Sequence, residues 1–364
     1  MLHWVVTVIT GNTHAVARWP EGGLENVPQC PVCSGDRREA VYNDLTDEVF
    51  RCAPGRWNLK RCLDCGSAYL DPRPTLSTIS LAYSTYYTHA RTGAVNPKGS
   101  SWLRRWRIAQ RNHFLNKNYG YRLRPSASTL FFLSNNRRRR FDRYAGYLRF
   151  PGPGARFLDV GCGNGSFLLQ MQSLGWEVCG VEPDRKSAEQ AQVAGLNVRV
   201  GYLPEAALPE LHFDAIMLSH VIEHLHDPVT TLLCCWKLLK PGGTMVILTP
   251  NYEASGRIRF ERHWRGLETP RHLVLFTENS LWKMMERCGF TVSRISRPSL
   301  SARTMFRTSY LLRCQSQCSQ PPGRLPWLLR LKSDWLAFKA DQETKADPRR
   351  TEELILLGAK NCRS

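Results

Sequence analysis

From residue 155 onward, short apolar runs alternate along the chain with segments whose apolar residues recur at helical spacing. The apolar runs predict buried strands at 156–160, 178–182, 197–200, 213–218 and 244–249. The segments between them predict helices near 166–174, 184–194 and 227–239. Strands that alternate with helices are typical of a parallel, doubly wound sheet with helices on both faces. We therefore predict an α/β fold for this part of the chain.

The pattern changes after the fifth predicted strand. A capped helix at 277–287 precedes a sixth strand near 290–296, and the apolar run at 353–357 predicts the last strand. Residues 301–350 lie between these two strands and predict a helical insertion. The insertion includes an apolar and basic helix around 327–335.

A glycine-rich turn follows the first of these strands. It reads D-V-G-C-G-N-G from Asp159 to Gly165, and glycine lets the backbone turn sharply and a ligand approach it closely. Glu182 ends the second strand, about where a carboxylate can accept two ribose hydroxyls. The dinucleotide fingerprint G-x-G-x-x-G is absent, because Ser166 and Leu168 stand where its last glycine would be. A pyrophosphate-binding dehydrogenase is therefore disfavoured.

The same string resembles motif I of the class I S-adenosylmethionine (SAM) methyltransferases. The resemblance implies a Rossmann-like, seven-stranded sheet whose seventh strand enters antiparallel, and SAM as the cofactor. It also implies that residues 200–204 border the adenine. The implied cofactor-binding residues are Asp159, Gly161, Cys162, Gly163, Gly165, Glu182, Ser219 and His220.

Two further segments resemble this group. The stretch from Phe213 to Pro228 is similar to the fourth strand and its exit in small-molecule enzymes such as those of quinone biosynthesis. The segment Trp264–Leu273, W-x-G-x-x-x-P-x-H-L, occurs in the same broad group. Together these similarities imply a small-molecule acceptor.

Methyl transfer requires mainly that acceptor, methyl group and sulfur be aligned. A hydroxyl acceptor also needs a base near its proton, and histidine is the usual one. The candidates are His220, His224 and His272, with Glu223 as the group that orients them. Each has a structural alternative, since these side chains could instead shape the cofactor pocket, begin a helix or hydrogen-bond their own loop.

Four cysteines near the N-terminus form two C-x-x-C pairs, Cys30 with Cys33 and Cys62 with Cys65. Four thiolates complete a tetrahedral shell around Zn²⁺, and such a closed shell is structural rather than catalytic. The pairs therefore predict a zinc ribbon with one zinc per chain. The D-P-R-P exit at 71–74 strengthens the resemblance to zinc-ribbon class I methyltransferases.

The formal net charge of +19 is concentrated in two segments. Residues 101–150 carry 13 Lys and Arg against one acid, and residues 291–364 carry 14 against six. Such segments suit an anionic partner, a nucleic acid or an anionic membrane surface, although arginine-rich helices can also be simply solvated. Residues 102–108 combine Trp with Arg, which suits either a membrane interface or a helix that covers a neighbouring core.

The chain is thus predicted to contain four parts. Residues 1–29 form an irregular leader, 30–75 the zinc ribbon, 76–150 a basic, aromatic helical linker, and 151–364 the SAM-binding domain with its insertion at about 301–350. Thirteen scattered cysteines favour a reducing compartment, and the N-terminus has no basic region or cleavage site of a signal peptide. We expect a cytoplasmic protein, at the membrane surface if the basic segments meet lipid.

The leading functional hypothesis is a SAM-dependent methyltransferase for a small, hydroxylated acceptor. An anionic, sugar or lipid-linked acceptor would use the basic segments. One alternative is an RNA methyltransferase whose ribbon and basic arm bind phosphates, but no N-P-P-Y-type motif accompanies it. Another is a non-catalytic scaffold with the same fold, which the intact glycine turn and Glu182 disfavour.

Overall fold

The computed structural model describes residues 18–84, 102–127, 135–295, 300–317 and 325–361. Most of the predicted leader and the linker residues 85–101 therefore lie outside the described residues. Within the described residues, no helix is both long enough and apolar enough to cross a membrane.

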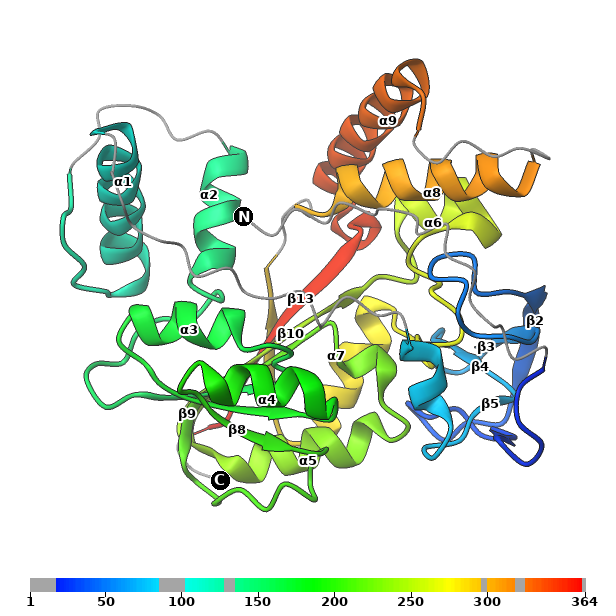
Figure 1. Ribbon diagram of the computed structural model, residues 1–364, viewed down its shortest axis with the longest axis horizontal. Helices are drawn as coiled ribbons and strands as arrows, with labels where there is room; N and C mark the ends of the chain where they lie inside the picture. The colour runs from blue at the N-terminus through cyan, green and yellow to red at the C-terminus, as the bar shows by residue number, and fades with distance from the viewer. Residues whose placement is uncertain (1–17, 85–101, 128–134, 296–299, 318–324, 362–364) are drawn as a thin grey trace.

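Seven strands form a single sheet in the order β12-β13-β10-β9-β6-β7-β8 (Figure 1). Neighbours among β6 to β10 pair in parallel, whereas β13 is antiparallel to both β10 and β12. This confirms the predicted Rossmann-like class I sheet with an antiparallel seventh strand. The strands are β6 (Arg156–Val160), β7 (Glu177–Glu182), β8 (Asn197–Val200), β9 (Phe213–Ser219), β10 (Leu239–Pro250), β12 (Thr291–Arg294) and β13 (Glu353–Ala359).

Alternate residues of the central strands pack on opposite faces of this sheet. In β10, Met245 and Ile247 join the core that includes α5 and α7, whereas Val246 and Leu248 join the core that includes α3 and α4. The helices are α3 (Ser166–Ser173), α4 (Arg185–Val193), α5 (Pro228–Leu238) and α7 (Glu278–Arg287). Helices on both faces bury the sheet, which explains why its strands are continuous apolar runs.

Two details extend the sequence prediction. Strand β10 begins at Leu239, before the predicted limit of 244, and its register with β9 shifts between Leu239 and Thr244. The insertion holds the expected helix around 327–335, as α9 (Trp327–Ala346), and a further helix, α8 (Ala302–Gln317). The early start of β10 depends on pairing with β9, which single-sequence patterns do not contain.

The N-terminal unit is a separate four-stranded sheet in the order β11-β4-β3-β2. Its strands β2 (Arg38–Leu45), β3 (Trp57–Cys62) and β4 (Ala68–Leu70) precede the large sheet in sequence, whereas β11 (Val274–Leu275) follows β10. Two short strands, β1 (Leu24–Glu25) and β5 (Arg73–Pro74), pair beside it. The small sheet therefore takes its edge strand from the loop after the fifth strand of the large one.

The remaining helices gather on one side of the molecule. Figure 1 shows α1 (Trp102–Tyr119), α2 (Asn135–Tyr144), α8 and α9 above the sheet, with α3, α4 and α5 below them. The short helix α6 (Ser255–Phe260) and the 3₁₀ turns η1 (Ile79–Tyr83), η3 (Ile222–His224), η4 (Glu261–His263) and η5 (Pro348–Arg350) complete the described elements.

Candidate active site

The glycine turn between β6 and α3 is packed at two of its glycines and open at the third. Gly161, Gly163 and Gly165 all have positive φ, at 73°, 54° and 77°. A Cβ on Gly161 would lie 2.5 Å from Val221 Cγ2, and one on Gly165 would lie 2.4 Å from Leu196 Cδ1. A Cβ on Gly163 would meet no atom within 4 Å. Gly163 therefore faces free space, where a ligand could approach the backbone.

Glu182, the last residue of β7, holds this turn in place. The backbone N–H of Gly163 donates to Glu182 Oε2 at 2.7 Å, and that of Asp184 donates to Oε1 at 2.9 Å. Burial raises the pKa of Glu182, and the two backbone N–H groups oppose that shift by stabilising the charged form. The carboxylate is thus fixed beside the open side of Gly163.

Asp159 and Cys162 flank the turn but differ in what they can offer. Asp159 is buried, and burial followed by the neighbouring charge of Glu182 raises its pKa to about 8. A Cβ on Gly180 would lie 2.5 Å from Cys162 Sγ, so the sulfur packs against β7. The Cys162 side chain is therefore buried against β7.

His220 follows β9 directly and lies between two carboxylates. Its Nε2 is 3.0 Å from Glu353 Oε1, and its Nδ1 is 3.4 Å from Glu223 Oε1. Burial favours the neutral ring, but both carboxylates outweigh it and raise the pKa of His220 to about 9. The side chain keeps 34% of its surface exposed, whereas Glu223 and Glu353 are almost wholly buried. His220 is therefore the candidate that a ligand can reach.

Behind it lies a group of three residues, of which Glu223 and His272 are buried and His224 is half-buried. Their ligand atoms lie within 4.8 Å of one another, so they could hold a metal ion. Thr249 Oγ1 donates to Glu223 Oε2 at 2.9 Å. Burial would raise the pKa of Glu223, but the nearby histidines outweigh burial and lower the pKa to about 2. Glu223 is therefore a carboxylate. The group thus places a carboxylate beside two imidazole rings.

The two imidazoles are oriented by backbone carbonyls. His272 Nδ1 lies 2.7 Å from the carbonyl oxygen of Gly266, and burial lowers the pKa of His272 to about 4. His224 Nδ1 lies 2.9 Å from the carbonyl oxygen of Arg271. Each ring accordingly donates a hydrogen bond through Nδ1 to a carbonyl oxygen, which fixes its orientation. The rings meet edge to face at 4.8 Å.

The N-terminal unit contacts both segments that carry these histidines. Tyr83 Oη lies 3.0 Å from His224 Nδ1, and Arg73 Nη1 donates to the carbonyl of His226 at 3.0 Å. On the other segment, the backbone N–H of Leu70 donates to the carbonyl of Leu273 at 3.1 Å. The D-P-R-P exit and η1 therefore position the candidate site as well as ending the ribbon.

A fully buried arginine strengthens this contact. The Arg271 guanidinium pairs with the Asp47 carboxylate, donates to the Ala82 carbonyl at 2.8 Å and lies 3.3 Å from Glu268 Oε1. Its carbon Cζ also lies 4.2 Å from the centroid of the Phe50 ring. Because Arg271 precedes His272, this network fixes the backbone at one candidate residue.

The four ribbon thiols converge as predicted. Cys30 Sγ lies 3.7 Å from Cys65 Sγ, Cys33 Sγ lies 3.5 Å from Cys62 Sγ, and all four lie within 4.8 Å of one another. Zinc–thiolate bonds of ~2.3 Å in a tetrahedron place sulfurs ~3.8 Å apart. The spacing and chemistry of the four thiols therefore fit a zinc ion.

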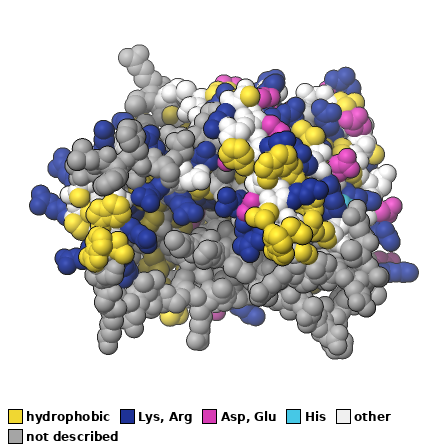
Figure 2. All heavy atoms as spheres, turned by 90° about the horizontal axis from the view of Figure 1, so that it is seen from above, with side chains coloured by type: hydrophobic (Ala, Val, Ile, Leu, Met, Phe, Trp, Pro, Cys, Tyr) yellow, Lys and Arg dark blue, Asp and Glu magenta, His cyan; other side chains and the backbone are white. Residues whose placement is uncertain are grey.

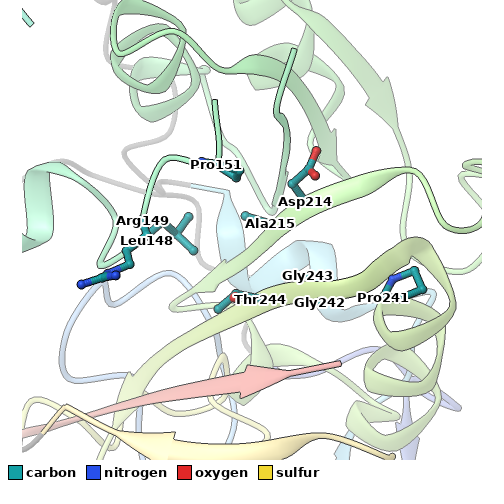
Figure 3. A pocket seen from close by; sticks show the side chains of 9 residues that line it. All are labelled: Leu148, Arg149, Pro151, Asp214, Ala215, Pro241, Gly242, Gly243 and Thr244. Carbon is teal, nitrogen blue, oxygen red and sulfur yellow. The ribbon is translucent and has the colours of Figure 1, made fainter. Parts of the chain in front are cut away.

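A shallow pocket of about 240 Å³ lies at the opposite edge of the sheet. Figure 3 shows Asp214 and Ala215 near the start of β9 facing Gly242 and Thr244 near the start of β10. Ligands of open α/β sheets bind at the carboxyl ends of the strands. This pocket is therefore separate from the glycine turn and His220.

The structure brings together most of the residues that the sequence singled out. Val221 packs against Gly161, so His220 and the glycine turn are neighbours. Glu353 and Tyr83 were missed, because their partners are distant in sequence. The sequence did contain one signal for Glu353, because two consecutive acids, Glu352 and Glu353, begin the last apolar run.

Comparison with known proteins supports the fold assignment. Residues 132–295 match the family described as a methyltransferase domain. The ubiquinone biosynthesis O-methyltransferase of Caulobacter vibrioides is 37% identical over 129 residues, which cover 34% of this chain and 51% of that protein. The protein of the same name from Dinoroseobacter shibae is 29% identical over 185 residues, covering 44% and 75%. The chain thus spans about half the length of the first curated relatives it matches.

Among solved structures, a SAM-dependent methyltransferase from Archaeoglobus fulgidus aligns with 61% of this chain and 92% of its own. The sequence identity is 21% and the TM-score 0.41. Because this similarity is weak, the fold is assigned from the strand order described above.

Proposed function

We propose, since residues 132–295 match a methyltransferase domain and the seven-stranded sheet has the class I strand order, that the protein transfers a methyl group from SAM to a hydroxyl oxygen of a small acceptor. The observation that carries the proposal is the contact of Val221 with Gly161. This contact sets His220 beside the turn whose Gly163 face is open.

The turn suits SAM in shape and in charge. Bound SAM supplies an electrophilic methyl group on a cationic sulfur. The open space at Gly163 admits a close ligand, and the fixed Glu182 carboxylate would accept hydroxyl hydrogens of a ribose. Buried Asp159 would gain a favourable partner from a cationic group of the cofactor, since its own environment disfavours its charge.

His220 is the proposed group on the acceptor side. Its pKa of about 9 means that the ring carries a positive charge at neutral pH, with both ring nitrogens beside carboxylates. It would therefore stabilise the negative charge on an acceptor oxygen rather than remove its proton, and a phenol, with an ordinary pKa of ~10, ionises more readily than an alcohol. Glu223 and Glu353 orient the ring, while His224 and His272 support Glu223 from behind. These roles favour a phenol or catechol over a sugar hydroxyl.

The names of the relatives point the same way. The two curated relatives described above are named ubiquinone biosynthesis O-methyltransferases. An aromatic hydroxyl acceptor is therefore the class to test first.

A structural zinc ion is proposed for Cys30, Cys33, Cys62 and Cys65. Metal analysis of the purified protein should find about one zinc per chain. Full folding in chelator with no bound zinc would reject it.

The enzymatic proposal can be tested without a known acceptor. Purified protein should bind SAM in calorimetry, and methyl-labelled SAM with host extract should deliver label to small hydroxylated aromatics. A His220→Gln variant should keep SAM binding and lose transfer. Label entering RNA would support the nucleic-acid alternative instead. Failure to bind SAM would support the scaffold alternative.

A further inference from the structure

Helix α9 places its bulky apolar residues outward and its small residues inward. Residues Ser333, Ala337, Ala340 and Thr344 are buried, together with Leu336. The exposed large side chains are Trp327, Leu328, Leu331, Trp335 and Phe338, with Trp327 exposed to 69%. At ~100° per residue these five occupy an arc of ~100° on the side opposite the buried residues. A helix that only covered its own core would show the reverse arrangement.

Basic residues flank this apolar arc. Lys332 and Lys339 lie along one edge and Arg330 along the other, and all three are exposed. The Lys339 ammonium lies 3.9 Å from the centroid of the Trp335 ring. The acids of α9 are each paired with an arginine of a neighbouring helix. The pairs are Asp334 with Arg307, Asp341 with Arg139, and Glu343 with Arg259. The outer face of α9 is therefore apolar with a basic rim.

Helix α1 repeats this chemistry on the same side of the molecule. Trp102 and Trp106 are one turn apart and exposed, the first to 74%, and Arg104, Arg105 and Arg107 lie beside them. Figure 2, seen from above, shows two groups of apolar side chains among dark-blue Lys and Arg, one over α1 at the left and one over α9 right of centre. The two groups therefore share one face.

We propose that the outer faces of α9 and α1 bind the surface of a bilayer that contains anionic lipids. Apolar and tryptophan side chains at a helix face enter the boundary between headgroups and acyl chains, while flanking Lys and Arg meet the anionic headgroups. Charge complementarity selects this occupant. A second copy of the chain would bring the same basic rims together, and RNA would leave the apolar arc without a partner.

The face lies next to the candidate site. Arg139 of α2 lies 3.6 Å from Asp341 of α9, and Arg143 of α2 lies 3.5 Å from Glu353, the partner of His220. A bilayer bound at α9 would therefore lie near the acceptor side of the proposed active site. The inference goes beyond methyl transfer and does not depend on it.

The test is co-sedimentation of the full chain with vesicles. The protein should bind vesicles of phosphatidylcholine with phosphatidylglycerol, bind pure phosphatidylcholine weakly, and dissociate as salt rises. A Trp327→Ser/Leu331→Ser/Phe338→Ser variant should bind about tenfold or more weakly, because the three exposed side chains no longer enter the interface. The matched control is Leu76→Ser/Val193→Ser/Leu233→Ser, which replaces exposed apolar residues elsewhere and should bind as the unmodified protein does.

Several results would overturn the proposal. One is equal binding to neutral and anionic vesicles, and another is unchanged binding by the α9 variant. A third is loss of poly(U) RNA binding in that variant while vesicle binding persists. A fourth is a protein that does not bind vesicles but forms a dimer, if the α9 variant is a monomer. That result would assign the face to self-association. Thermal unfolding of both variants checks that they remain folded.

Discussion

His220 Nε2 lies 3.0 Å from Glu353 Oε1, which joins the exit of β9 to the first residue of β13 across the end of β10. The ion pair connects a residue of the candidate site to the strand that follows the insertion. Any change in the path of α9 and η5 into β13 would therefore act on the charge of His220.

Glu353→Gln should lower the pKa of His220 from about 9 toward its ordinary value, since one of two carboxylates is lost. A histidine with a raised pKa stabilises the fold below ~6.5, and this contribution disappears as pH rises through about 9. The variant should therefore lose less stability between these pH values. NMR titration of the ring and urea unfolding against pH measure both effects. Glu343→Gln is the control, and an unchanged ring pKa in Glu353→Gln would contradict the assignment.

Asp159→Asn should stabilise the ligand-free protein above neutral pH and weaken its binding of SAM. Because the pKa of the buried carboxyl is raised to about 8, the folded state holds a proton that the unfolded state has released from about pH 4 upward. Stability therefore falls as pH rises through this window, by ~1.4 kcal/mol for each unit of the shift. Asparagine does not titrate, so the Asp159→Asn variant should not lose stability in this way. Urea unfolding at pH 5 and pH 9 tests the effect on stability, and calorimetry with SAM tests the effect on binding. The same pH dependence of stability in the variant and the unmodified protein would refute the first effect.

Gly163→Ala and Gly165→Ala should fail in different ways. At Gly163 the added Cβ meets nothing within 4 Å, so the cost to stability is the ~1–2 kcal/mol of a left-handed residue, while SAM should bind tenfold or more weakly. At Gly165 the Cβ would lie 2.4 Å from Leu196 Cδ1 and 2.9 Å from Ala191 Cβ, so unfolding should dominate. Thermal unfolding with and without SAM separates them. Equal SAM affinity in Gly163→Ala would place the cofactor elsewhere.

Arg271→Met should destabilise the protein by ~3–5 kcal/mol, because Asp47 would remain buried without its cation and Glu268 would keep only its pair with Arg265. Adding Asp47→Asn to this variant should recover part of the loss. A double-mutant cycle in urea measures the coupling. Additive losses would show that the buried pair is not coupled.

The features that depend on local structure could be predicted from the sequence. Strands 156–160 and 197–200 are apolar runs bounded by turns, and β6 and β8 have those limits. Thr277 caps α7 as its position suggested, with its side chain accepting from the backbone of Ser280. Local backbone chemistry decides these features, so a single chain shows them.

The missed features are contacts between segments far apart in the chain. His220 meets Glu353 through a strand order that inserts β13 beside β10, and His224 meets Tyr83 because the ribbon packs on the loop after β10. The outward apolar face of α9 was visible only as an apolar and basic helix, since periodicity does not reveal which side is buried. Long-range packing decides all three.

The pairing of β11 with β4 has a consequence for how the protein could be divided. A fragment ending near residue 75 would expose the edge of β4, and a fragment beginning after it would carry β11 with no sheet to join. Neither fragment is therefore expected to fold on its own as it does in the full chain. The ribbon and the large sheet are therefore expected to fold as one unit, and a substitution at the thiols should also disturb the segment that carries His272.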